Sequence, residues 1–340
     1  MSKNKTCYLP EKRGKVGGQA VLEGVMMKSG DNVSLTVRKE DGSMVTKNSK
    51  FVAFKTRSSL FSIPVIRGVV NFIDSMRLSF STLGESAEMM GIDDDMGDSK
   101  FERWLSKTFG DKIMNAIMTV AMVLAVVLSV VLFFWLPTFL TKLLEMLTGD
   151  LGMWKSVVEG AIKIGIFVAY LSLVSLMKDI RRTFEYHGAE HKSIFCYEAG
   201  KELTVENVRE QSRFHPRCGT SFMFVMLALS IISGMFIPWH NQLLRVICKL
   251  LMLPLVMGIG YEFLMYAGKH DNFIVRVLSA PGLWMQRITT REPDDSQIEC
   301  AIASLKAAMP EEFPPEAAEE AEAEKAEETE ADETENSEEK

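Results

Sequence analysis

The chain has 340 residues, and its mean hydropathy is positive (+0.07) although its last thirty residues are almost entirely polar. A soluble enzyme of two domains, each about 150 residues long, would not concentrate its apolar residues in this way. Residues 310–340 contribute −13 to a total charge of −7, which leaves +6 on the rest of the chain. The composition therefore argues against a soluble two-domain enzyme and leaves room for an anionic partner.

The cysteines are scattered and form no CxxC pair or even-numbered framework. They are Cys7, Cys196, Cys218, Cys248 and Cys300. This pattern indicates reduced thiols in a reducing compartment, so we expect no disulfide to organise the fold. We also expect no secretory signal peptide, because no long apolar run follows a basic start in the first hundred residues.

Residues 1–58 are polar and basic and predict a small β-rich cytoplasmic cap. Residues 33–37 alternate between apolar and polar, Asp41-Gly42 is a hairpin turn signal, and residues 44–46 supply a return strand. The glycine-rich segment 17–27 lacks the Gly-Lys-Ser/Thr of a phosphate loop. A structural turn is therefore favoured over a ligand-binding loop.

Residues 59–112 predict amphipathic or interfacial helices. In 59–84, Pro64 suits a first helical position. One apolar stripe then comprises Ile66, Val69, Val70, Ile73 and Phe80. Such a helix lies in the membrane interface or packs on neighbouring spans, and we favour packing.

Four apolar segments predict membrane spans, because about 20 residues cross a bilayer. They are 113–141, 152–177, 218–244 and 244–266. The first and third carry no charge, whereas Lys155, Glu159 and Lys163 interrupt the second. These three lie four residues apart, so they share one helix face and can pair.

Basic residues concentrate in 100–112, 178–217 and 269–291, whereas the other two connections hold one and none. Four spans place all three basic segments on one side. We therefore expect a mainly α-helical, multi-pass membrane protein with both termini cytoplasmic. Its four-helix membrane domain would cover residues 113–305, with a cytoplasmic loop at 178–217. The acidic tail, 306–340, is expected to be disordered.

The residues best suited to metal binding or catalysis lie in Tyr-His-Gly-Ala-Glu-His, residues 186–191. His187 and His191 are four apart, which places both imidazoles on one helix face where they can bind one ion. Glu190 is close enough to take a proton from water at that ion. The order His-x-x-Glu-His also occurs in inverted zinc proteases. The pair could instead be solvated or bind lipid phosphates.

Three further residues are candidate ligands. His215 and Cys218 flank Pro216, which imposes a rigid loop, and Glu262 is a costly carboxylate inside an apolar span. Glu262 could alternatively pair with Lys269 or Arg67, and Cys218 could be a small buried residue. A closed shell of histidines and cysteine would be structural, whereas three ligands plus water would be catalytic. Imidazole and thiolate favour Zn²⁺ over Mg²⁺ or Ca²⁺.

Three segments in order, 17–27, 186–192 and 215–222, resemble the YqhQ-like family of bacterial membrane proteins. The resemblance covers roughly residues 12–305 and omits the acidic tail. It implies a protein of the bacterial inner membrane that is a predicted metal-dependent enzyme of unspecified substrate. The matching positions in these segments are His187, Glu190, His191, His215 and Cys218, together with Gln19 and Glu23 of the glycine-rich segment.

Two hypotheses follow. In the first, the protein is a zinc hydrolase acting at the cytoplasmic face on a peptide or lipid-linked group, with Glu190 as the catalytic base. In the second, it is a non-catalytic membrane scaffold whose metal is structural and whose basic cap contacts a protein complex or anionic lipid. Membrane lipid is the expected partner in both, and nucleic acid is not expected. Cation transport is weaker, since Glu159 is the only second acid within a span.

Overall fold

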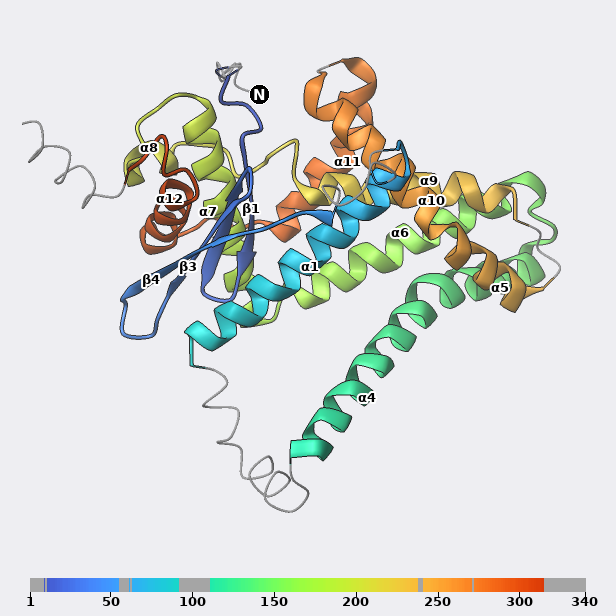
Figure 1. The fold of residues 1–340 in the computed structure, drawn as a ribbon. Helices are drawn as coiled ribbons and strands as arrows, with labels where there is room; N and C mark the ends of the chain where they lie inside the picture. The colour runs from blue at the N-terminus through green and yellow to red at the C-terminus, as the bar shows by residue number, and fades with distance from the viewer. Residues whose placement is uncertain are drawn as a thin grey trace, which may run out of the picture.

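The computed structural model describes residue 9 and residues 11–54, 61, 63–91, 111–237, 241–270 and 272–314. These parts are mainly helical, with one antiparallel sheet near the N-terminus (Figure 1). The strands are β1 (Val16–Val21), β2 (Gly24–Ser29), β3 (Asn32–Arg38) and β4 (Met44–Lys50). The long helices are α1 (Ile66–Met89), α4 (Asp111–Val130), α5 (Leu136–Thr148), α6 (Lys155–Val174), α7 (Lys178–Glu198), α9 (Gly219–Met235), α10 (Gln242–Lys269), α11 (Phe273–Thr289) and α12 (Asp295–Ala308). Shorter helices are η3 (Val131–Trp135), η4 (Gly152–Trp154) and α8 (Val205–Arg209).

The sheet is a simple meander in the order β1-β2-β3-β4. The predicted hairpin is present as β3 and β4, and Gly42 in its turn has a φ of 84° that favours glycine. The glycine-rich segment 17–27 forms most of the β1–β2 hairpin, in which Val21 is opposite Gly24. The β-rich cap is therefore confirmed as a four-stranded sheet.

Helices cover both faces of this sheet. On one face, α7 and α12 pack against β1, β2 and β3 around Val25, Met27, Tyr186 and Ile298. On the other face, α1 approaches β1 and β3, and Leu78 packs against the apolar cluster of the sheet (Figure 1). Helix α7 is thus enclosed, and its residues 188–198 are all buried.

Within the residues that the structure describes, three helical stretches are long and apolar enough to cross a membrane. They are Thr119–Thr148, Lys155–Val174 and Gln242–Ala267. The prediction of four spans is wrong for 218–244, because α9 ends at Met235 and its apolar part, Phe222–Met235, is shorter than about 20 residues. The other three predicted spans coincide with α4–α5, α6 and α10.

Helix α1 does pack on a neighbour, but not through the predicted stripe. Ile66, Ile73 and Phe80 are 43%, 50% and 71% exposed. Contact with α10 is made instead where Gly68 meets Gly258, so closely that an added Cβ on Gly68 would lie 2.8 Å from the Gly258 Cα. Three residues of the apolar stripe of α1 therefore face outward, whereas Val69 and Val70 are half-buried.

A buried carboxylate joins α6 to α10. Glu159 accepts a hydrogen bond from Arg245 at 2.9 Å and also pairs with Lys249, and all three side chains are at most 5% exposed. The sequence suggested partners within α6, but these two cations come from α10. Lys155 pairs with Glu145 of α5. Charges that interrupt the apolar helices thus hold them together.

The C-terminal region departs from the expected boundary of the tail. Helix α12 continues to Ala308, which is buried together with Leu305 and Met309. The tail prediction therefore begins too early, and its remainder, residues 315–340, lies outside the described residues. The four cysteines within the described ranges are free thiols, as expected.

Replacing Glu159 with Gln is expected to lower the free energy of unfolding by about 3–5 kcal/mol, because Arg245 and Lys249 would remain buried without a carboxylate. Thermal unfolding of the detergent-purified protein measures the loss. The exposed change Lys142→Gln on α5 is the control and should shift stability by less than about 0.5 kcal/mol. Equal stability of both variants would contradict a role for the buried pair.

Candidate metal centre

Helix α7 places two imidazoles side by side. His187 and His191 are one turn apart on the face turned toward β1, and their ring centroids are 4.4 Å apart. His191 is only 2% exposed, and the His187 side chain is 18% exposed. The predicted helical pairing of these residues is therefore present.

Cys218 brings a thiol to the pair from a different part of the chain. It is the residue that precedes α9, and its Sγ lies 3.3 Å from His187 Nε2. One ligand atom from each of His187, His191 and Cys218 lies within 4.8 Å of the others. We call these three residues the His-His-Cys cluster; it could hold a metal ion.

Backbone carbonyls orient both imidazoles. His187 Nδ1 is 2.8 Å from the Thr289 carbonyl oxygen at the end of α11, and His191 Nδ1 is 2.5 Å from that of Arg213. A carbonyl oxygen only accepts, so each Nδ1 carries the proton and each Nε2 keeps its lone pair. Metal-binding histidines show this arrangement, in which an outer partner fixes the tautomer. The donor set therefore fits a metal ion.

Burial keeps His191 in the form that a metal requires. Its pKa is lowered, chiefly because the buried ring is poorly solvated when charged, so the neutral imidazole is favoured. Burial alone would raise the pKa of Cys218, but His191 and Thr220 outweigh it and lower that pKa. Both shifts favour the neutral imidazole and the thiolate that bind metal.

Glu190 lies beside the cluster and is 5% exposed, with its Oε2 4.0 Å from His187 Nε2. Burial raises its pKa to about 7, opposed by His187 and by a hydrogen bond from the Gly18 amide. Such a carboxyl can hold or release a proton near neutral pH. Gly18 permits this approach, because a Cβ there would lie 3.0 Å from Glu190 Cγ.

A cavity of about 440 Å³ opens onto these groups, which we call the metal cavity. Residues 16–20 of β1 form one wall, α7 a second, and the segment from His215 to Thr220 a third. All three residues of the His-His-Cys cluster line it, as does Glu190. A ligand position beside the cluster is therefore reachable from the cavity.

Two predicted ligands lie outside the cluster. His215 faces Glu198, with 3.9 Å between Nε2 and Oε2, and its backbone is held by Gln286 of α11. Glu262 pairs with Arg67 of α1, which is the alternative considered from the sequence. The structure thus brings together His187, His191 and Cys218 with Glu190. His215 lines the same cavity, with its ring centroid 5.5 Å from that of His191, but is not one of the three clustered ligands, and Glu262 lies elsewhere.

Glu198 explains the position of the loop that carries Cys218. Burial would raise its pKa, but His215, Arg217 and the Gly14 amide outweigh this and lower that pKa to about 2. The resulting carboxylate binds Arg217 and accepts a hydrogen bond from Gly14 at 2.9 Å. An ionised, buried anchor therefore fixes the chain one residue before Cys218.

Gln19 and Glu23, which lie in the glycine-rich segment and match the family, each bind a neighbouring helix. Gln19 exchanges hydrogen bonds with Ser79 of α1, and its amide also reaches Thr82 at 3.3 Å. Glu23, whose φ of 48° is unusual for a residue other than glycine, pairs with Arg182 of α7. These contacts position β1 and α7, whereas Gly18 touches the site itself.

Fold and site together define a mainly helical protein whose described part holds three helices long enough to cross a membrane and a cluster able to hold a metal ion. The family model described as "Protein of unknown function (DUF1385)" matches residues 63–311. "Uncharacterized protein YqhQ" of Bacillus subtilis (strain 168) is 34% identical over 294 residues, which cover 86% of this chain and 92% of that relative. The chain therefore belongs to the YqhQ-like family, as its motifs indicated. No solved structure matches it.

Metal content tests the His-His-Cys cluster directly. Elemental analysis of the detergent-purified protein should find about one transition-metal ion per chain. The double change His187→Ala/His191→Ala and the single change Cys218→Ser should each remove most of it, because fewer than three ligands remain. His270→Ala, an exposed histidine outside the cluster, is the control. Equal metal in all four proteins would contradict the assignment.

Gly18 and Gly17 form a matched pair on β1. In Gly18→Ala the new Cβ would lie 2.7 Å from the Met26 carbonyl oxygen and 3.0 Å from Glu190 Cγ, whereas one on Gly17 would meet nothing within 4 Å. We expect Gly18→Ala to lose about 1–3 kcal/mol of stability and part of its bound metal. Gly17→Ala should retain both. Unfolding and metal analysis measure the difference, and indistinguishable variants would contradict this packing.

Proposed function

We propose that this protein is a membrane-embedded, zinc-dependent hydrolase whose site faces the cytoplasm. The three apolar helices support the membrane location, since each is long enough to cross the hydrocarbon layer. Their orientation rests on the basic segments of the sequence. The peptide or lipid-linked substrate expected from the sequence belongs to the same proposal.

The ligand atoms support zinc. Two imidazoles and a thiolate are typical zinc ligands, whereas magnesium and calcium prefer oxygen. Tetrahedral zinc with bonds of about 2.0–2.3 Å spaces its ligand atoms about 3.5 Å apart. The 3.3 Å between Cys218 Sγ and His187 Nε2 is close to that spacing.

The observation that carries the proposal is the combination of three ligands, a neighbouring carboxyl and an accessible cavity. Structural zinc sites are usually closed by four protein ligands, whereas catalytic sites use three and leave one position for water or substrate. Here three ligand atoms converge on the wall of the metal cavity. A zinc ion bound there would supply Lewis acidity and make water a better nucleophile at neutral pH.

Glu190 has the role of general base in this proposal. Its carboxylate would take the proton of the attacking water and pass it to the leaving group. The Gly18 amide holds the carboxylate, and burial keeps its pKa near 7, so the group can both accept and donate a proton. The carbonyls of Thr289 and Arg213 keep the two imidazoles in their ligand tautomers.

The change Glu190→Gln separates this function from a structural metal site. Purified wild type and variant are compared at equal zinc content on 4-nitrophenyl acetate and on a quenched fluorescent peptide. We expect the variant to keep its zinc and its thermal stability and to lose about a hundredfold to ten-thousandfold in zinc-dependent rate.

Equal rates in the two proteins at equal zinc content would contradict a catalytic role for Glu190. They would favour the alternative, in which the metal only ties the segment before α9 to α7 and the basic surface binds a protein partner or anionic lipid. Glu185→Gln, on the same helix but outside the metal cavity, is the control and should leave the rate unchanged.

A further inference from the structure

A cavity of about 700 Å³ lies among the apolar helices, and we call it the apolar cavity. Helices α9 and α10, which pack against each other, supply the largest part of its wall. Helix α1, which packs on α10, borders it on one side, and α6 and η3 border it on the other. Cavities of about 300–1,000 Å³ commonly bind small molecules. The apolar cavity is therefore large enough for a ligand.

The lining of the apolar cavity is almost free of charge. Lys163 is the only charged residue in it among the described residues, and its ammonium group donates a hydrogen bond to Ser230 at 3.2 Å. The same ammonium lies 5.2 Å from the centre of the Phe134 ring, so its charge has partners within the protein. The rest of the lining consists mainly of aromatic and aliphatic side chains. Such a surface suits a hydrocarbon chain.

The apolar cavity is open to the outside along three helices. Met76 of α1, Tyr170 of α6 and Met223 of α9 line it and are 39%, 44% and 38% exposed. In the membrane location proposed above, this rim faces hydrocarbon and not water. The chain of a membrane lipid can therefore enter the cavity directly from the bilayer.

The apolar cavity adjoins the metal cavity at the start of α9. Gly219 lines both cavities and directly follows Cys218 of the His-His-Cys cluster, so the two Cα atoms are about 3.8 Å apart. Gly219 is exposed, and a Cβ added to it would meet nothing within 4 Å. The glycine therefore leaves the space between the two cavities open. From this point the lining face of α9 extends to Ser230, over about 16 Å at 1.5 Å per residue.

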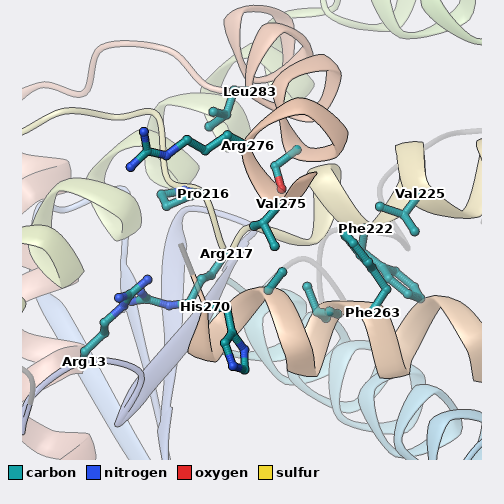
Figure 2. A pocket seen from close by; sticks show the side chains of 13 residues that line it. Arg13, Pro216, Arg217, Phe222, Val225, Phe263, His270, Val275, Arg276 and Leu283 are labelled. Atoms are coloured by element: carbon teal, nitrogen blue, oxygen red, sulfur yellow. The ribbon is translucent and has the colours of Figure 1, made fainter. Parts of the chain in front are cut away.

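A smaller cavity of about 230 Å³, where α9, α10 and α11 meet, also adjoins the apolar cavity, because Phe222 lines both (Figure 2). Its polar groups do not converge. Figure 2 shows the Arg276 guanidinium directed away from those of Arg13 and Arg217, and Arg217 is paired with Glu198. The ligand atoms of the His-His-Cys cluster do converge. The polar end of an amphipathic ligand therefore belongs in the metal cavity.

We propose that the apolar cavity binds the acyl chain of a membrane lipid ester and that the metal cavity receives the ester group. The chain lies along α9, between α1 and α6, and the ester passes Gly219 to reach the His-His-Cys cluster. Of the two substrates expected from the sequence, this selects the lipid-linked group over the peptide. The fate of the ester rests on the proposed hydrolase function, whereas binding of the chain does not.

Hydrolysis of such an ester consumes one water molecule. The water oxygen bonds to the carbonyl carbon, and the bond between that carbon and the alkoxy oxygen breaks. The Glu190 carboxylate takes a proton from the water and passes it to the departing alcohol. The products are a fatty acid, whose chain occupies the apolar cavity, and an alcohol, which leaves through the metal cavity.

Chain-length dependence tests the use of the apolar cavity. The full-length protein is assayed at equal zinc content on 4-nitrophenyl acetate and 4-nitrophenyl decanoate in CHAPS, a steroid detergent without an alkyl chain that could compete. The zinc-dependent kcat/KM should be at least tenfold higher for the decanoate, because each buried methylene group adds to binding. Equal values for the two esters would overturn the proposed substrate class.

Binding of radiolabelled hexadecyl methyl ketone separates the chain site from the hydrolase, since this ketone keeps the long chain and the carbonyl but cannot be hydrolysed. Ethyl methyl ketone should compete at least a hundredfold more weakly. Ser75→Trp, at an exposed position of α1 that lines the apolar cavity, should weaken binding at least tenfold by filling space. Ser81→Trp, exposed on the same helix outside the lining, is the matched control.

Gly219→Leu tests the junction of the two cavities. The new side chain has open space around its Cβ, so the fold should be kept while the path of the chain is blocked. The ratio of kcat/KM for the decanoate to that for the acetate should fall at least tenfold. Gly165→Leu on α6 is the matched control, because Gly165 is also exposed with nothing within 4 Å and lines none of the three cavities. Thermal unfolding shows whether each variant is folded, and Ser75→Trp provides the test if Gly219→Leu is not.

The two proposals fail in different ways. Ketone binding that requires the long chain and is weakened by Ser75→Trp, without hydrolysis of either ester, would refute the hydrolase and support the lipid site. Equal ketone binding by Ser75→Trp, Gly219→Leu and their controls would overturn the lipid site, even if 4-nitrophenyl acetate is hydrolysed. Chain-dependent binding that persists in His187→Ala/His191→Ala supports a lipid site that is independent of the metal.

Discussion

The enclosure of α7 is the constraint on which the rest of the structure depends. This helix is rich in polar residues, yet its residues 188–198 are buried between the sheet and α12. Each buried polar side chain needs a partner, since an unsatisfied one costs about 1–3 kcal/mol. Those partners come from distant segments: α11 for His187, the loop at Arg213 for His191, and the loop before α9 for Glu198. Satisfying the polar groups of α7 therefore fixes the positions of α11 and of the loop between α8 and α9.

This constraint explains why the candidate site lies at the junction of two parts. The sheet with α7 and α12 forms one part, and the apolar helices form the other (Figure 1). Cys218 and Gln286 belong to the elements that connect them, because one precedes α9 and the other lies in α11. The metal cavity takes its polar groups from α7 and the loop before α9, and it adjoins the apolar helices at Gly219. That combination suits a ligand with two chemically different ends.

Much of the site could be predicted from the sequence, and the predictions that are wrong have physical reasons. The helical spacing of His187 and His191 correctly predicted their shared face, and the motif at 215–222 supplied Cys218. Glu262 could not be assigned, because its partner Arg67 lies 195 residues away and contact between α1 and α10 has no sequence signal. The carbonyls of Thr289 and Arg213 belong to the backbone, which no residue type reveals. The predicted span 218–244 failed because this apolar run of 27 residues contains a helix of only 17.

Cys218 is both the N-cap of α9 and a member of the His-His-Cys cluster. An ion bound there would cross-link the start of an apolar helix to a helix beginning forty residues earlier in the chain, at Lys178. Any ion that binds only the native arrangement stabilises it by mass action. The supply of that ion in the cell would then set how firmly α9 is anchored. Depletion of the metal would therefore weaken the attachment of α9 to α7, whether or not the ion has a catalytic role.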